Sequence, residues 1–134
     1  YSIRNRLKTQ QIYDKLIDEA PDILSGSLLE RLKASDENCI IKLTDLYNET
    51  FGAAPEIIIP PEEISYPAYR EGLMLALRLK IDAIALERTF LSLSGFNKLG
   101  RSLYENILVF DLEQQNLLNT LLIQLHETTD CNDL

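Results

Sequence analysis

The chain has 134 residues, of which 46% are hydrophobic and 25% charged, and its five Gly and five Pro leave little turn chemistry for a many-stranded sheet. Its 13 Lys and Arg stand against 21 Asp and Glu, a net charge of −8, which disfavours nucleic acid or an anionic membrane surface as a partner. No apolar run approaches the ~18 residues needed to span a bilayer. We therefore expect a single helical domain.

The two cysteines, Cys39 and Cys131, show no metal-ligand spacing, and they fit a reducing compartment better than a disulfide framework. A cytoplasmic location is the corresponding expectation. The lone His126 falls in the expected last turn of a helix, where the helix dipole favours a cation. Position 1 is Tyr rather than an initiator Met, and we expect the chain to be a fragment or a trimmed form of a longer protein.

Hydrophobic periodicity predicts the first two helices, at about 2–19 and 27–50. Residues spaced three and four apart mark the first one: Ile3, Arg6, Gln10, Tyr13 and Ile17. Pro21 closes it, because proline disfavours helical geometry in the preceding residue. The second helix is expected to end before Gly52, which suits a left-handed C-terminal cap.

Residues 53–66 are expected to be a crossover, because Pro55, Pro60 and Pro61 cannot sustain a helix there. A helix of about 24 residues is ~36 Å long at ~1.5 Å per residue. About fourteen extended residues reach ~46 Å. The crossover can therefore run the length of a bundle and start the third helix parallel to the second.

The third and fourth helices are expected at about 67–93 and 97–126, with Gly95 between them. The third has a heptad-like row: Leu73, Ala76, Lys80, Ala83, Glu87 and Phe90. Two helix pairs, each with a short internal turn, and one long crossover between the pairs describe a ferritin-like topology. The predicted fold class is all-α, a ferritin-like four-helix bundle with a long crossover between helices 2 and 3.

The segments LKTQQIYDKLIDEAPD and LLERLKASDENCIIKLTDLYNETFG resemble the first helix pair of rubrerythrin-related ferritin-like domains. The segments PAYREGLMLALRLKIDAIALERTF and LYENILVFDLEQQNLLNTLL resemble the second pair. In that family, a carboxylate on the first helix of each pair and a Glu-x-x-His on the second bind two iron or manganese ions in the bundle centre. The resemblance implies that the same positions form the candidate site in this chain.

Transferred to this sequence, the family's Glu-x-x-His pattern falls on Glu37 and Ile40 in the second helix and on Glu113 and Asn116 in the fourth. Both histidines are absent. The first-helix ligand falls on Arg6 when the family's Tyr is matched to Tyr13, and the third-helix ligand falls on Lys80. The resemblance therefore implies a degenerate di-metal site, with Glu87 as a possible extra carboxylate, and we expect no bound metal or other cofactor.

Two interpretations of the cations remain open. Arg6 and Lys80 could occupy the space of the metal ions and neutralise Glu37 and Glu113 through buried ion pairs. Alternatively, they could extend their charged heads to water near the bundle ends. A register error of one turn would instead bring Gln10 or Glu87 into the centre.

The leading hypothesis is a non-catalytic ferritin-like domain that serves as an interaction or assembly module, as a homodimer or with another protein. The alternative is a rubrerythrin- or ferroxidase-like oxidoreductase that binds iron or manganese through Glu37, Glu87 and Glu113. A third hypothesis is that loss of the metals left a cavity for an apolar or acidic ligand.

Overall fold

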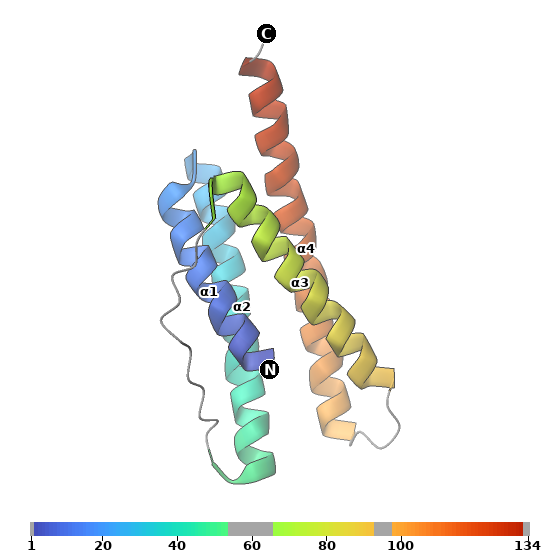
Figure 1. Cartoon of the computed structure of the whole chain (residues 1–134). Helices are drawn as coiled ribbons and strands as arrows, with labels where there is room; N and C mark the ends of the chain where they lie inside the picture. Colours follow the sequence, from blue (N-terminus) through green and yellow to red (C-terminus); the bar gives the residue numbers. More distant parts are fainter. Residues whose placement is uncertain (1, 54–65, 93–97, 133–134) are drawn as a thin grey trace.

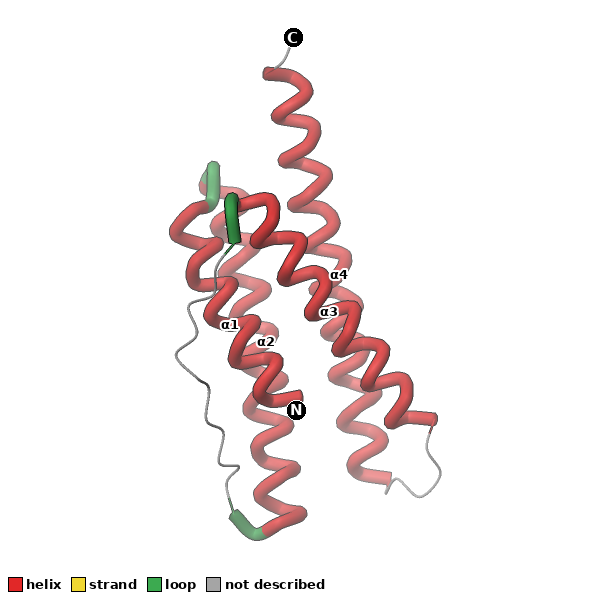
Figure 2. The backbone as a smooth tube through the Cα atoms, viewed as in Figure 1, coloured by secondary structure: helices red, strands yellow, loops and turns green. Residues whose placement is uncertain are grey.

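The computed structural model describes residues 2–53, 66–92 and 98–132, which form four helices. They are α1 (Ser2–Glu19), α2 (Ile23–Phe51), α3 (Tyr69–Ser92) and α4 (Lys98–Asn132). The described residues outside them form short loops (Figure 2). The predicted all-α four-helix bundle is confirmed. None of the described helices is both long and apolar enough to cross a membrane.

The helices form two antiparallel pairs, α1 with α2 and α3 with α4 (Figure 1). The pairs pack together through α1 against α3 and α2 against α4, so α2 and α3 lie diagonally opposite each other. α2 and α3 run in the same direction, and α2 ends at the opposite end of the bundle from the start of α3. That arrangement agrees with a crossover between them, although 54–65 lie outside the described residues.

Local signals explain where α2 begins and ends. The Asp22 side chain accepts a hydrogen bond from the Ser25 backbone N–H at 2.7 Å and caps the first turn. α2 therefore begins at Ile23 rather than near residue 27. At its other end Gly52 has φ 70°, and its N–H donates to the Asn48 carbonyl at 2.8 Å. The left-handed cap predicted at Gly52 is confirmed.

α1 has the predicted bounds, whereas α3 and α4 differ from theirs. α3 begins at Tyr69 rather than at Pro67, and α4 continues to Asn132, past the predicted end near His126. The last turns of α4 project beyond the ends of the other three helices (Figure 1). The sequence after His126 is polar, so it lacks the apolar periodicity that would have extended the prediction.

Two apolar clusters fill the bundle, one on each side of a charged layer. The larger cluster contains Ile12, Tyr13, Leu16, Leu29, Leu32, Leu73, Ala76, Leu118 and Leu121. The smaller one contains Cys39, Leu43 and Ile107. On α2 the buried Asp36 lies between the two clusters, and on α4 the buried Asp111 does the same. The core is therefore interrupted at mid-height by ionisable side chains.

The contact between α1 and α3 is close enough to require glycine at position 72. A Cβ placed there would lie 2.7 Å from Leu16 Cδ2 and 2.7 Å from Tyr66 Cζ. Leu16 is fully buried, and the Tyr66 hydroxyl donates to Glu19, so neither side chain is free to move aside.

We expect Gly72→Ala to destabilise the protein by about 1–3 kcal/mol through overpacking, although alanine favours a helix over glycine by about 1 kcal/mol. Gly26→Ala is the matched control, because a Cβ at that position of α2 meets only Ala20 Cβ, at 3.8 Å. That control should raise the free energy of unfolding by about 0.5–1 kcal/mol. Chemical denaturation of the two variants measures both effects, and equal signs would contradict the packing argument.

Candidate functional site

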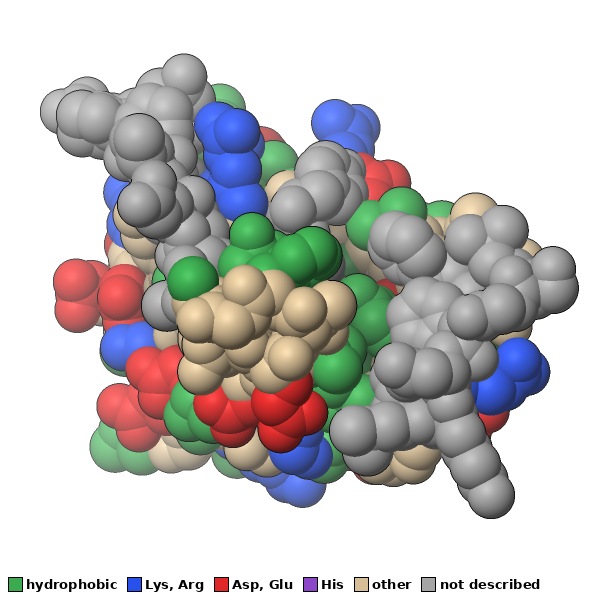
Figure 3. Space-filling view, turned by 90° about the horizontal axis from the view of Figure 1, so that it is seen from below, with side chains coloured by type: hydrophobic (Ala, Val, Ile, Leu, Met, Phe, Trp, Pro, Cys, Tyr) green, Lys and Arg blue, Asp and Glu red, His purple; other side chains and the backbone are tan. Residues whose placement is uncertain are grey.

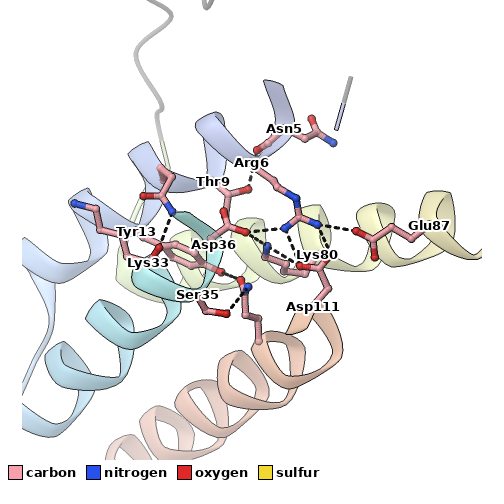
Figure 4. A network of polar contacts seen from close by, with 12 residues as sticks. Asn5, Arg6, Thr9, Tyr13, Lys33, Ser35, Asp36, Lys80, Glu87 and Asp111 are labelled. Atoms are coloured by element: carbon pink, nitrogen blue, oxygen red, sulfur yellow. Dashed lines mark hydrogen bonds and ion pairs between the residues drawn. The ribbon is translucent and has the colours of Figure 1, made fainter. Parts of the chain in front are cut away.

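The charged layer joins five ionisable side chains from all four helices (Figure 4). They are Arg6 from α1, Asp36 from α2, Lys80 and Glu87 from α3, and Asp111 from α4, and none is more than 2% exposed. Buried charges are costly unless they are paired and hydrogen-bonded. The geometry of the pairing therefore decides what this layer can do.

Arg6 contacts three carboxyl groups. Its Nη1 donates to Asp36 Oδ1 at 2.8 Å and to Asp111 Oδ1 at 2.9 Å. Its Nη2 donates to Asp111 Oδ2 at 2.5 Å and to Glu87 Oε1 at 2.6 Å. The pair with Asp111 is thus bidentate, the geometry in which guanidinium and carboxylate bind most strongly.

Lys80 completes the neutralisation of the two aspartates. Its Nζ donates to Asp36 Oδ1 at 2.5 Å and to Asp111 Oδ1 at 3.2 Å. Asp36 Oδ1 and Asp111 Oδ1 each accept from both cations. The ammonium and guanidinium groups therefore lie between the carboxylates of α2 and α4.

Glu87 supplies a third carboxyl group, whose pKa is raised from 4.5 to about 9. Burial is the main cause, followed by a hydrogen bond with Asp111 and by the negative charge of Asp111. Arg6 and Lys80 oppose the shift. A neutral Glu87 leaves two cations against the carboxylates of Asp36 and Asp111, so the layer is balanced at neutral pH.

The pKa values of Asp111 and Arg6 move in the directions that an ion pair requires. For Asp111, burial would raise the pKa, but the hydrogen bonds from Arg6 and Glu87 and the charges of both cations hold it well below its usual range. For Arg6, burial would lower the pKa, but the hydrogen bond and charge of Asp111 and the charge of Asp36 outweigh that effect. Both groups are therefore charged.

A second set of polar contacts borders the charged layer. The Tyr13 hydroxyl donates to Gln114 Oε1 at 3.3 Å, and Gln114 Nε2 donates to Ser35 Oγ at 3.2 Å. Burial, with the negative charges of Asp36 and Asp111, raises the pKa of Tyr13 well above its usual value. Its hydroxyl is thus held in the protonated form that donates this bond.

The structure decides between the two interpretations of the cations. Arg6 and Lys80 form buried ion pairs, but with other carboxylates than the predicted Glu37 and Glu113, and extension of their heads to water is wrong. Glu87, the predicted extra carboxylate, pairs with Arg6. Gln10 is buried, but its Nε2 donates to the Lys33 carbonyl at 2.9 Å, outside the charged layer.

The predicted carboxylate partners are wrong. Glu37 and Glu113 are exposed, and Asp36 and Asp111 take the places expected for them. Each helical residue turns the side chain by about 100°, so a shift of one or two positions moves a side chain to another face. The two positions predicted to replace the family's histidines also lie outside the buried layer: Ile40 is half-buried and Asn116 is exposed.

When Asp36 and Asp111 replace the two glutamates as the site positions, the residues three positions after them are also buried. Three positions after Asp36 and Asp111 stand Cys39 and Gln114, and both are buried. The interval from Arg6 to Asp36 is 30 residues, and that from Lys80 to Asp111 is 31. With the glutamates, the interval from Arg6 to Glu37 is 31 residues and that from Lys80 to Glu113 is 33. The two halves of the chain therefore agree more closely with the aspartates, and this signal in the sequence could have identified them.

The residues present do not fit a di-metal centre. Within the described part of the chain, no three His, Cys, Asp or Glu side chains come together in an arrangement that could hold a metal ion. A divalent ion about 4 Å from either cation would be repelled by about 8 kcal/mol at an effective dielectric constant near 20.

Comparison with protein-family models, with curated proteins and with solved structures gives no match to this chain.

The raised pKa of Glu87 makes a prediction about stability. Between its ordinary value of 4.5 and about 9, the folded state holds a proton that the unfolded state releases. The free energy of unfolding therefore falls with rising pH, by up to about 1.4 kcal/mol per pH unit from this group. The stability that comes from protonated Glu87 is fully present below pH 4.5 and is lost as the pH rises to about 9.

We expect Glu87→Gln to remove this pH dependence, because glutamine is a neutral donor of the same shape. The variant should become more stable than the wild type as the pH rises toward about 9, measured by urea denaturation across the pH range. Glu113→Gln, at an exposed position of α4, serves as the control and should follow the wild type. Parallel stability curves for Glu87→Gln and the wild type would refute the argument.

Proposed function

We propose that this chain is a ferritin-like domain that does not depend on metal and works as an interaction or assembly module rather than as an enzyme. The observation that carries the proposal is the position of Arg6 and Lys80, whose cationic groups lie among three buried carboxyl groups. In a di-metal bundle the ions themselves provide that positive charge. In this chain, Arg6 of the first helix pair and Lys80 of the second provide the positive charge.

The internal repetition of the bundle supports the ferritin-like assignment. Each helix pair supplies a cation from its first helix, Arg6 or Lys80, and an aspartate from its second, Asp36 or Asp111. The parallel course of α2 and α3 also suits the topology with one long crossover (Figure 1). The assignment rests on this arrangement together with the sequence resemblance.

A protein partner suits the surface better than a nucleic acid. On the end of the bundle drawn in Figure 3, the Lys and Arg side chains of the described residues stand apart and alternate with acidic ones. A phosphate-binding surface needs clustered basic groups. A cytoplasmic location is part of the proposal, since the buried Cys39 is a free thiol.

Metal content is the direct test. Protein purified without chelator should contain far less than one equivalent of iron or manganese per chain, measured by elemental analysis. Added ferrous iron should be oxidised no faster with the protein than without it. About two equivalents of metal, with accelerated oxidation, would favour the ferroxidase-like alternative and overturn the proposal.

A reverse exchange tests whether the cations stand where metals could bind. Arg6→Glu combined with Lys80→Glu adds two carboxyl groups to the three buried ones and removes both cations, so the bundle should be unfolded or strongly destabilised without metal. Manganese(II) should restore helicity and raise the melting temperature, because metal binding couples to folding. Circular dichroism measures both effects.

The matched control is Arg4→Glu with Arg88→Glu, which makes the same charge change at exposed positions of α1 and α3. It should stay folded without metal and respond little to manganese(II). If the buried double variant ignores manganese(II) as the control does, Arg6 and Lys80 do not stand at metal positions.

A further inference from the structure

An open groove lies between the first half of α3 and the last part of α4. Figure 1 shows that these two helices diverge toward the end of the bundle past which α4 projects. The residues that line it include Arg70, Met74, Leu77, Arg78, Leu122 and His126. This groove is separate from the charged layer of the interior.

The α3 wall of the groove has an exposed apolar stripe. Met74 is 49% exposed and Ile81 is 48% exposed, and they stand two helical turns apart with Leu77 between them. Residues at this spacing lie on one face of a helix. Exposed apolar side chains gathered on one face mark an interaction site more often than single scattered ones do.

The α4 wall continues the apolar surface. Leu122 and His126 line the groove, and Ile123, which is 57% exposed, lies beside them on the same part of the helix. Among the described side chains of α4, Leu125 is the last that packs against the larger apolar cluster. From there to Asn132 about 10 Å of helix, at ~1.5 Å per residue, projects beyond the bundle.

The charges of the groove and of the projecting helix are complementary. Arg70 and Arg78 are exposed on the α3 side, with Glu71 as an acidic neighbour in the lining. The sequence of the projecting part carries Glu127 and Asp130 and no Lys or Arg after His126. Within a chain of net charge −8, this pairing links a basic part of the surface to an acidic one.

We propose that two copies of this chain dimerise through this groove, with the projecting end of α4 of each copy lying in the groove of the other. The acidic residue Glu127 then faces the arginines of the other copy, and the exposed Met74, Ile81 and Ile123 are covered. Because the two copies exchange this helix end reciprocally, the contact is isologous and closes as a two-fold dimer. The proposal rests on the role as an interaction module proposed above, and it names the surface and the partner.

Sedimentation velocity over a range of protein concentrations tests the proposal. The wild type should be a dimer that dissociates on dilution. Met74→Glu and Ile81→Glu should each weaken association at least tenfold, because a charge is then buried against an apolar surface. Both positions are about half-exposed in one chain, so the fold should tolerate the change, and circular dichroism checks this.

Ile41→Glu is the matched control, since Ile41 is 59% exposed but lies on α2, away from the groove. It should leave the dimer unchanged. Arg78→Glu and Glu127→Arg should each weaken association, and their combination should restore part of it. That rescue distinguishes a specific pairing from general loss of surface charge.

A wild type that stays monomeric at every concentration overturns the proposal, as does a dimer that Met74→Glu and Ile81→Glu leave intact. A monomer that associates only with another protein also overturns it, because the groove then serves a different occupant. Metal analysis of the same samples keeps the two proposals apart. Metal-poor monomers would refute the dimer alone, whereas metal-loaded dimers would refute the metal-independent role alone.

Discussion

The guanidinium of Arg6 ties α1 to all three other helices. It bonds to Asp36 on α2, to Glu87 on α3 and to Asp111 on α4, in a layer that is closed to solvent. Removing one partner from such a buried pair costs about 3–5 kcal/mol, whereas replacing the whole set by apolar residues is often neutral. The network is therefore better explained by the helix alignment that it specifies than by a gain in stability.

The alignment is specific because the donors and acceptors are directional. An apolar layer would accept a helix displaced along its axis at modest cost, since hydrophobic contacts have no preferred direction. A bidentate pair such as that of Arg6 with Asp111 breaks as soon as either helix moves. The buried Arg6 Nε and Asp36 Oδ2 have no hydrogen-bond partner among the described residues, so the side chains of the layer do not satisfy every polar atom that it buries.

The fold class could be predicted from the sequence because it depends on many residues at once. Apolar periodicity and Gly52 marked four helices and the end of α2, and errors at single positions did not alter that result. The candidate site, in contrast, depends on which face of each helix is buried. Asp36 and Glu37 are neighbours in sequence, yet one is fully buried and the other exposed, and in the sequence only the interval from Arg6 bears on the choice between them. The choice depends on packing, because Leu32 and Cys39 fix which side of α2 faces inward.

The protonation of Glu87 also could not be predicted from the sequence. Its pKa reflects burial and the nearby charge of Asp111, and both arise only when α3 and α4 pack together. With Glu87 neutral, the interior carries equal numbers of cations and carboxylate anions without any ion from solution. The balance depends on that one proton, because an ionised Glu87 would leave three carboxylates against two cations.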